Sequence, residues 1–102
     1  MSSFAKRLKK ARLEAGISQE KLGVLAGIDE MSASARMNQY ERGKHMPDVS
    51  MVERLATVLK IPAAYFYVEE DDIAELLVDL YRLKQTDRKK VIQYVAQLFE
   101  EK

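Results

Sequence analysis

Two short helical segments that each end at a glycine constrain the fold of this chain more than any other feature. In ISQEKLGVLAGI, Ser18 is a good N-cap for a helix that begins at Gln19, and Gly27 follows the last apolar position. The apolar positions between them share one helical face: Leu22, Leu25 and Ala26. In MNQYERGK, Gly43 ends a helix in the same way, because glycine adopts the left-handed conformation without steric cost. The second helix is therefore predicted within residues 29–42.

The length and composition exclude several classes of protein. A chain of 102 residues forms one ordinary domain with a single core. It has no apolar run of about 18 residues and no signal-peptide pattern, so we expect neither a membrane partner nor export. There is no cysteine, which excludes a disulfide framework and a thiolate metal site and is compatible with a reducing compartment. We expect a cytoplasmic protein that has no metal and no cofactor.

Amphipathic helices are also predicted on both sides of this pair. The preceding helix is capped by Ser2 or Ser3, ends at Gly16 and has four apolar positions: Phe4, Leu8, Ala11 and Ala15. Its other side is expected to be a solvated or phosphate-contacting basic face: Lys6, Arg7, Lys9 and Lys10. The following helix is capped by Asp48 and is expected to bury five apolar residues: Val49, Val52, Leu55, Ala56 and Leu59.

A short aromatic helix is predicted after Pro62, a residue suited to a first helical turn. It carries Ala63 and the cluster Tyr65, Phe66 and Tyr67. Stacking on single-stranded nucleic acid would need interleaved basic residues, and none occurs between Lys60 and Arg82. The cluster is therefore assigned to the core or to a dimer interface.

The acidic run at residues 69–72 is the one candidate boundary, and it separates 1–68 from a helical extension, 69–102. A helix beginning at Asp71 or Asp72 is expected to bury Ile73, Leu76, Leu77, Leu80 and Leu83. A last helix, capped by Thr86 or Asp87, has the apolar positions Val91, Ile92, Val95, Leu98 and Phe99. These apolar faces must be covered by the domain, by each other or by a second subunit. We assign Ile73, Leu76, Leu77, Leu80, Val91, Val95, Leu98 and Phe99 to dimerisation.

The chain resembles the phage-repressor and Cro-like helix-turn-helix proteins, known as the XRE family. The resemblance rests on three blocks in this order: RLKKARLEAGISQEKL, YERGK and PDVSMVERLATVLKIP. The resemblance runs from about Phe4 to Tyr67. It implies an all-α fold, with a five-helix repressor-like domain followed here by two C-terminal amphipathic helices. It also implies a homodimer that binds a double-stranded operator with two half-sites about one helical turn apart.

The resemblance implies an ion pair between Arg12 and Glu41 that stabilises the fold. An arginine beside a small core is tolerated only with a carboxylate partner. The physical argument therefore also predicts a carboxylate partner for Arg12. The charge distribution fits a DNA-binding N-terminal part. Residues 1–68 hold 11 Lys and Arg against 7 Asp and Glu, whereas residues 69–102 hold 6 against 9.

The second helix of the pair is expected to enter the major groove. Ala33, Met37 and Tyr40 fall on one side, which must face the core. The residues expected to read bases are Ser32, Ser34, Ala35, Arg36 and Gln39. Those expected to bind phosphates, at the helix ends, are Gln19, Arg42 and Lys44.

The spacing between the two glycine-terminated segments departs from the family. Glu41 follows Gly27 by 14 positions, about four more than is usual. The extra residues extend the reading helix by about one turn at its N-terminus or lengthen the turn before it. Asp29 and Glu30 lie in this insert, where a carboxylate caps the helix or accepts a hydrogen bond from cytosine.

Two classes of function remain after an enzyme is set aside. His45 is the only histidine, and the chain has neither a phosphate-binding glycine loop nor a paired nucleophile and base. A sequence-specific transcriptional regulator is the favoured hypothesis. The alternative is an antitoxin-type protein, whose C-terminal helices bind a partner protein and whose helix-turn-helix regulates its own gene.

Overall fold

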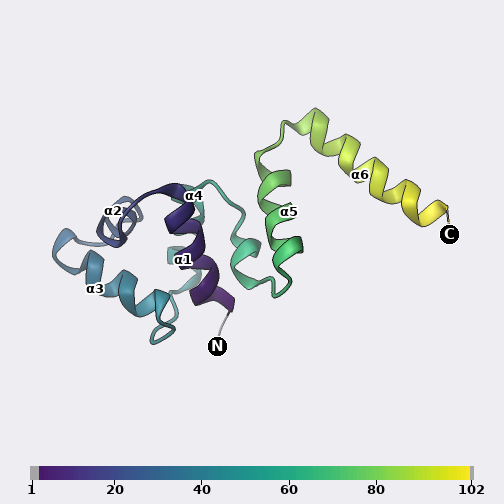
Figure 1. The fold of residues 1–102 in the computed structure, drawn as a ribbon. Coiled ribbons are helices and arrows are strands. Elements are labelled where there is room, and N and C mark those ends of the chain that lie inside the picture. The colour runs from purple at the N-terminus through teal and green to yellow at the C-terminus, as the bar shows by residue number, and fades with distance from the viewer. Residues whose placement is uncertain (1–2, 102) are drawn as a thin grey trace.

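All regular elements of residues 3–101, which the computed structural model describes, are helices (Figure 1). They are α1 (Ser3–Ala15), α2 (Gln19–Leu25), α3 (Glu30–Glu41), α4 (Val49–Leu59), η1 (Ala63–Tyr67), α5 (Asp71–Arg82) and α6 (Gln85–Glu100). The all-α prediction is confirmed, and the fifth helix, η1, is a 3₁₀ helix. The predicted cap at Ser2 lies outside the described residues. Within them, no helix has the length and apolarity needed to cross a membrane.

Most helix ends follow from local chemistry. The side chains of Ser18, Asp29 and Asp48 each accept a hydrogen bond from a backbone N–H in the first turn of the helix that follows. Gly27 and Gly43 follow α2 and α3 with φ values of 96° and 73°, in the region that glycine adopts freely. The start of α6 differs from the prediction, because Lys84 and not Thr86 or Asp87 is its N-cap and makes no side-chain cap hydrogen bond.

The core lies between α1, α2, α3, α4 and η1. Leu8, Leu22 and Leu55 are fully buried there. Val49, expected on the buried face of α4, is 74% exposed because it is the first residue of the helix and lies at the edge of the core. Tyr65 and Phe66 are buried as well, and the Phe66 ring lies 4.9 Å from that of Phe4, so these two aromatic residues belong to the core. Tyr67 is more than half exposed.

A close approach between α2 and α3 depends on Gly23, in the middle of α2. A Cβ atom at this position would lie 2.9 Å from the Cβ of Ala33 and 3.0 Å from the Cγ of Met37. These distances are shorter than carbon atoms tolerate, so the absence of a side chain sets how closely the two helices pack.

We expect Gly23→Ala to destabilise the protein. Overpacking costs about 1–3 kcal/mol, and the higher helix propensity of alanine returns up to about 1 kcal/mol. Urea denaturation followed by circular dichroism measures the difference. Glu20→Ala, at an exposed position of the same helix, is the control and should change stability by no more than about 0.5 kcal/mol. An alanine variant as stable as the wild type would show that α2 and α3 can separate at no cost.

The face of α5 that packs on the core differs from the expected one. Ala74 is 0% exposed and Val78 packs beside it, because a small side chain lets α5 approach η1 closely. The leucine-rich face is not covered by its own chain: Ile73, Leu76 and Leu83 are exposed, and Leu77 and Leu80 are partly buried. The buried core is thus continuous across residues 68 and 69.

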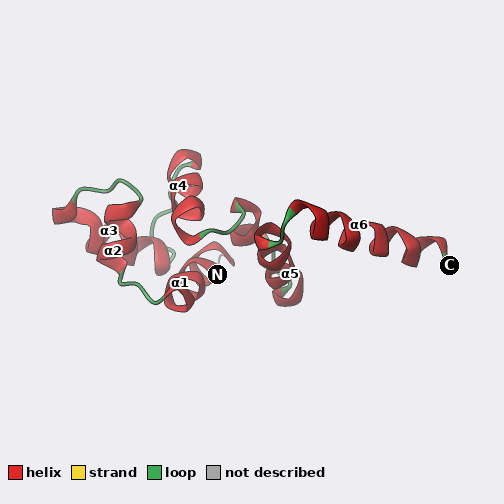
Figure 2. Cartoon of the chain, turned by 90° about the horizontal axis from the view of Figure 1, so that it is seen from above, coloured by secondary structure: helices red, strands yellow, loops and turns green. Residues whose placement is uncertain are grey.

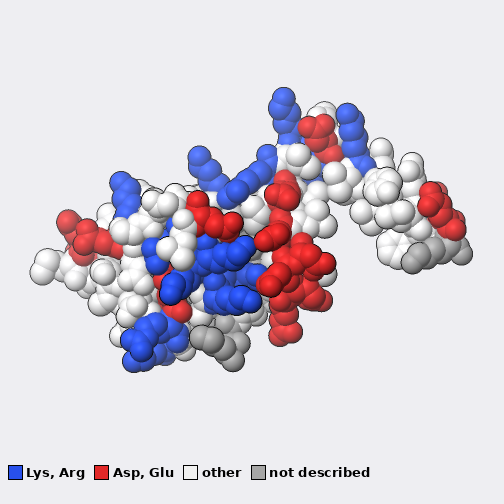
Figure 3. Space-filling model, viewed as in Figure 1, with Lys and Arg blue, Asp and Glu red and all other residues white. Residues whose placement is uncertain are grey.

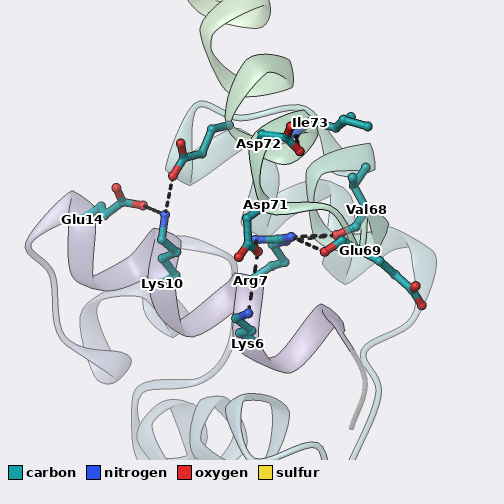
Figure 4. A network of polar contacts seen from close by, with 10 residues as sticks. Lys6, Arg7, Lys10, Glu14, Val68, Glu69, Asp71, Asp72 and Ile73 are labelled. Atoms are coloured by element: carbon teal, nitrogen blue, oxygen red, sulfur yellow. Dashed lines mark hydrogen bonds and ion pairs between the residues drawn. The ribbon is translucent and has the colours of Figure 1, made fainter.

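Arg7 fastens α1 to the start of α5 and corrects the prediction that it belongs to an exposed basic face (Figure 4). Its side chain is only 2% exposed. Its Nε and Nη2 donate to the carbonyl of Val68 at 3.1 and 3.0 Å, Nη2 also donates to that of Glu69, and Nη1 lies 2.8 Å from a carboxylate oxygen of Asp71. The hydrogen bond from Arg7, with further attraction from Lys6, lowers the pKa of Asp71. Arg7 is inward because it lies three positions after Phe4 and four before Ala11.

The last helix, α6, projects away from the rest of the molecule (Figures 1 and 2). It has no buried residue. Only Leu83 and Lys84 separate it from α5, and Arg88 holds this junction by donating to the carbonyls of Leu80, Tyr81 and Leu83. The molecule is therefore elongated, with extents of 55 × 28 × 23 Å.

Candidate nucleic-acid interface

One side of α3 faces the core and the other faces solvent. Ala33, Met37 and Tyr40 are buried, as the sequence predicts. All five residues expected to read bases are exposed: Ser32, Ser34, Ala35, Arg36 and Gln39. At 100° per residue, Ala35 points directly away from the core and Gln39 lies close to the same line, whereas Ser34 and Arg36 lie toward the flanks.

Two residues on the outward side of α3 were not among the residues expected to read bases. Met31 lies one turn before Ala35 on the outward line and is 93% exposed. Asn38 lies beside the same line, one residue before Gln39. Helical spacing predicts both positions, because Met31 lies four residues before Ala35 and Asn38 lies three residues after it.

The extra residues between Gly27 and Glu41 lie in α3. Asp29 accepts a hydrogen bond from the N–H of Met31 and caps the helix, which begins at Glu30, only three residues after Gly27. The connection from α2 is therefore short, and the insert lengthens the solvent-facing helix. Asp29 has the capping role, and the adjacent Glu30 has no hydrogen bond or ion pair from its side chain within residues 3–101.

A buried network fixes the C-terminal end of α3 to α1 and α2. Arg12 donates through Nε to Glu41 Oε2 at 2.6 Å and through Nη2 to Oε1 at 3.1 Å, in a bidentate pair. Its Nη1 donates to the carbonyl of Ile17 at 2.9 Å. The two side chains are 11% and 2% exposed. Such burial of a charge pair is tolerated because both oxygens of the carboxylate and all three nitrogens of the guanidinium take part in hydrogen bonds.

Gln19, at the start of α2, joins this network. Its Nε2 donates to Glu41 Oε1 at 3.1 Å and lies 3.4 Å from Oδ1 of Asn38. The side chain expected to bind phosphate is therefore already engaged in holding α2 against α3. Its contact with Asn38 connects it to the outward surface of α3.

Arg42 and Lys44 lie just beyond α3. Both are exposed, and within residues 3–101 neither side chain takes part in a hydrogen bond or an ion pair. Their charges are thus free to meet an external anion. Figure 3 shows further Lys and Arg side chains gathered over α1 and acidic side chains over the adjoining start of α5.

These groups offer hydrogen bonds and positive charge. No cluster of three or more His, Asp or Glu side chains that could hold a metal ion occurs in residues 3–101. A helix with one exposed polar face and cationic side chains at its end has the shape and chemistry that fit a major groove and its phosphates.

Comparison with known proteins agrees with this geometry. A family described as a helix-turn-helix domain matches residues 3–64. Among solved structures, one titled "Crystal structure of transcriptional regulator BswR" is 46% identical, superimposes with a TM-score of 0.90, and matches over 99% of this chain and 98% of that one. A search of curated proteins found no match.

Proposed function

Because this chain belongs to the helix-turn-helix domain family, we propose that it is a sequence-specific, double-stranded DNA-binding transcriptional regulator of the XRE type. The observation that carries the proposal is the exposed polar face of α3, held against α1 and α2 by the buried Arg12–Glu41 pair. The likeness to the transcriptional regulator BswR includes α5 and α6, since it covers 99% of the chain. It therefore favours a regulator over an antitoxin-type protein.

In this proposal α3 reads base edges in the major groove. Gln39 suits adenine, Arg36 suits guanine or a phosphate, and the methyl group of Ala35 suits thymine. Ser32 and Ser34 lie on the two sides of Ala35 and contact neighbouring bases or backbone. Arg42 and Lys44 bind phosphates, and Gln19 is a weaker phosphate contact because its amide already donates to Glu41.

The protein acts as a homodimer on an operator with two half-sites. Residues 1–68 contact DNA, and residues 69–102 supply the dimer interface. The support for this is the row of exposed or partly exposed apolar side chains on α5 and α6: Ile73, Leu76, Leu77, Leu80, Val91, Val95, Leu98 and Phe99. A surface of this kind in water is a site of protein association.

Substitutions on α3 and just after it test the roles separately. Arg42→Ala and Lys44→Ala should weaken binding to all sequences alike and reduce the slope of log K against log[salt] by about 1 each. Gln39→Ala should cost about 1–3 kcal/mol at one base-pair position and leave the slope unchanged. Selection of bound sequences from random DNA, followed by salt titration of the best sequence, measures both effects.

Gln93→Ala, at an exposed glutamine of α6, is the matched control and should alter neither the base preference nor the slope. If Gln39→Ala keeps the wild-type preference at every position, α3 does not read bases through this residue. If none of the variants binds DNA differently from the wild type, the exposed face of α3 is not the interface.

A further inference from the structure

The charges of α6 are arranged against the dipole of the helix. Its N-terminal end carries Lys84, Arg88, Lys89 and Lys90 against a single acidic residue, Asp87, and its last residues include Glu100 and Glu101 (Figure 3). A helix N-terminus has partial positive charge and its C-terminus partial negative charge, so cations at the start and anions at the end destabilise an isolated helix. Arg88 is explained by its hydrogen bonds to the end of α5, and Lys90 lies 3.8 Å from the carboxylate of Asp87. Within residues 3–101, the side chains of Lys84, Lys89, Glu100 and Glu101 have no such partner.

The same helix has a wide apolar face that its own chain leaves open. The face consists of Val91, Ile92, Tyr94, Val95, Leu98 and Phe99, and all but Val91 are exposed, up to 75% for Phe99. At 100° per residue these six positions cover nearly half of the helix circumference, and Lys89, Lys90, Glu100 and Glu101 lie outside that face.

We propose that α6 pairs antiparallel with α6 of a second copy of this chain. This rests on the homodimer of the proposed function and specifies how its two chains meet. In the antiparallel arrangement the basic start of each helix lies beside the acidic end of the other. The basic residues at the N-terminus of one helix then lie beside the acidic residues and the negative C-terminal pole of the partner helix. The acidic residues in turn lie beside the basic residues and the positive N-terminal pole of the partner.

A parallel pair would have the reverse effect. Lys84, Lys89 and Lys90 would face the same residues of the partner, and so would Glu100 and Glu101. Like charges that flank a helix seam disfavour an orientation and opposite charges favour it, as at the flanking positions of coiled coils. Antiparallel pairing is also what a two-fold axis perpendicular to the helices produces, and such an axis is the common symmetry of dimers.

Distances between spin labels distinguish the orientations in the full-length protein. The chain has no cysteine, so Thr86→Cys and Gln93→Cys each introduce one labelling site per subunit. Both sites lie on the side of α6 away from the apolar face. In a fully overlapped antiparallel pair, Gln93 lies near the two-fold axis, whereas the two Thr86 sites are offset by about 20 Å along the helices.

Double electron–electron resonance should therefore give a clearly longer distance for the label at position 86 than for the label at position 93. Equal distances at the two sites, or a longer one at position 93, would overturn the antiparallel arrangement and leave the homodimer intact. Absence of any coupling between subunits at both sites would overturn the homodimer itself, and the antiparallel arrangement with it.

Charge reversal provides a second readout. The double variant Glu100→Lys and Glu101→Lys should weaken dimerisation about tenfold at low salt, with the difference shrinking at about 1 M salt. The same change improves the match with the dipole of the single helix, so the helix content of the monomer should not fall. A dimer that is unweakened at low salt would contradict the pairing of opposite ends.

Discussion

Replacement of Glu41 by alanine is expected to lower the free energy of unfolding by about 3–5 kcal/mol, a large part of the stability of a domain of this size. Glu41 accepts hydrogen bonds from Arg12 and Gln19, and its side chain is only 2% exposed. Its removal would leave the guanidinium of Arg12 poorly hydrated and without a counter-charge. Binding to DNA would then be lost because α3 is no longer held against α1 and α2.

Chemical denaturation of four proteins tests this expectation: the wild type, Glu41→Ala, Arg12→Met and the double variant. The double variant should be more stable than the sum of the two single losses predicts, since it buries no unpaired charge. Glu53→Ala removes an exposed carboxylate on α4 and is the control, with an expected change of no more than about 0.5 kcal/mol. A Glu41→Ala protein that unfolds at the wild-type denaturant concentration would show that the pair does not stabilise the fold.

The second large effect is expected when α6 is removed by ending the chain after Leu83. The truncated protein should remain folded, because α6 has no buried residue. It should sediment as a monomer at concentrations where the full chain is a dimer. Its affinity for a two-half-site operator should fall about 100-fold or more, because each half-site is then bound independently, while affinity for one half-site is unchanged.

The position of the cut matters. A chain ending at residue 70 also lacks Ala74, which is buried in the core, and Asp71, which pairs with Arg7. It should therefore melt at a lower temperature than the chain ending at Leu83. A chain ending at Leu83 that dimerises as tightly as the full protein would remove α6 from the interface. One that melts much lower than the full chain, at concentrations where both are monomers, would show that α6 folds back onto the core.

The helices and the exposed face of α3 could be predicted from the sequence because they depend on local rules. Ser18, Asp29 and Asp48 are caps wherever they precede a helix, and the buried positions of α3 repeat with helical spacing. The sequence does not place the insert, since a longer helix and a longer turn satisfy the same spacing. The structure distinguishes them because the cap lies at Asp29.

Other features depend on contacts between distant residues, and the sequence does not specify them. Arg7 lies among lysines, so its sequence neighbours indicate a surface position. It is buried because it donates to the carbonyls of Val68 and Glu69, which lie 61 and 62 residues away along the chain. The leucines of α5 suggest its buried face, yet Ala74 is the residue of α5 that is fully buried, where α5 packs on η1. Nothing in the sequence around Gly23 indicates that Ala33 and Met37 of α3 pack directly against it.

Three arginines hold the two ends of α5 against the neighbouring helices. Arg7 ties the start of α5 to α1, Arg82 donates to the carbonyls of Leu59 and Lys60 at the end of α4, and Arg88 fixes α6 to α5. A dimer joined through α6 would thus present its two α3 helices at one separation and one rotation about the duplex. DNA turns once in about 10–10.5 base pairs, so half a turn added between the half-sites would carry one of them to the opposite side of the duplex. Operators of this protein would then be distinguished by the length of their spacer as well as by their bases.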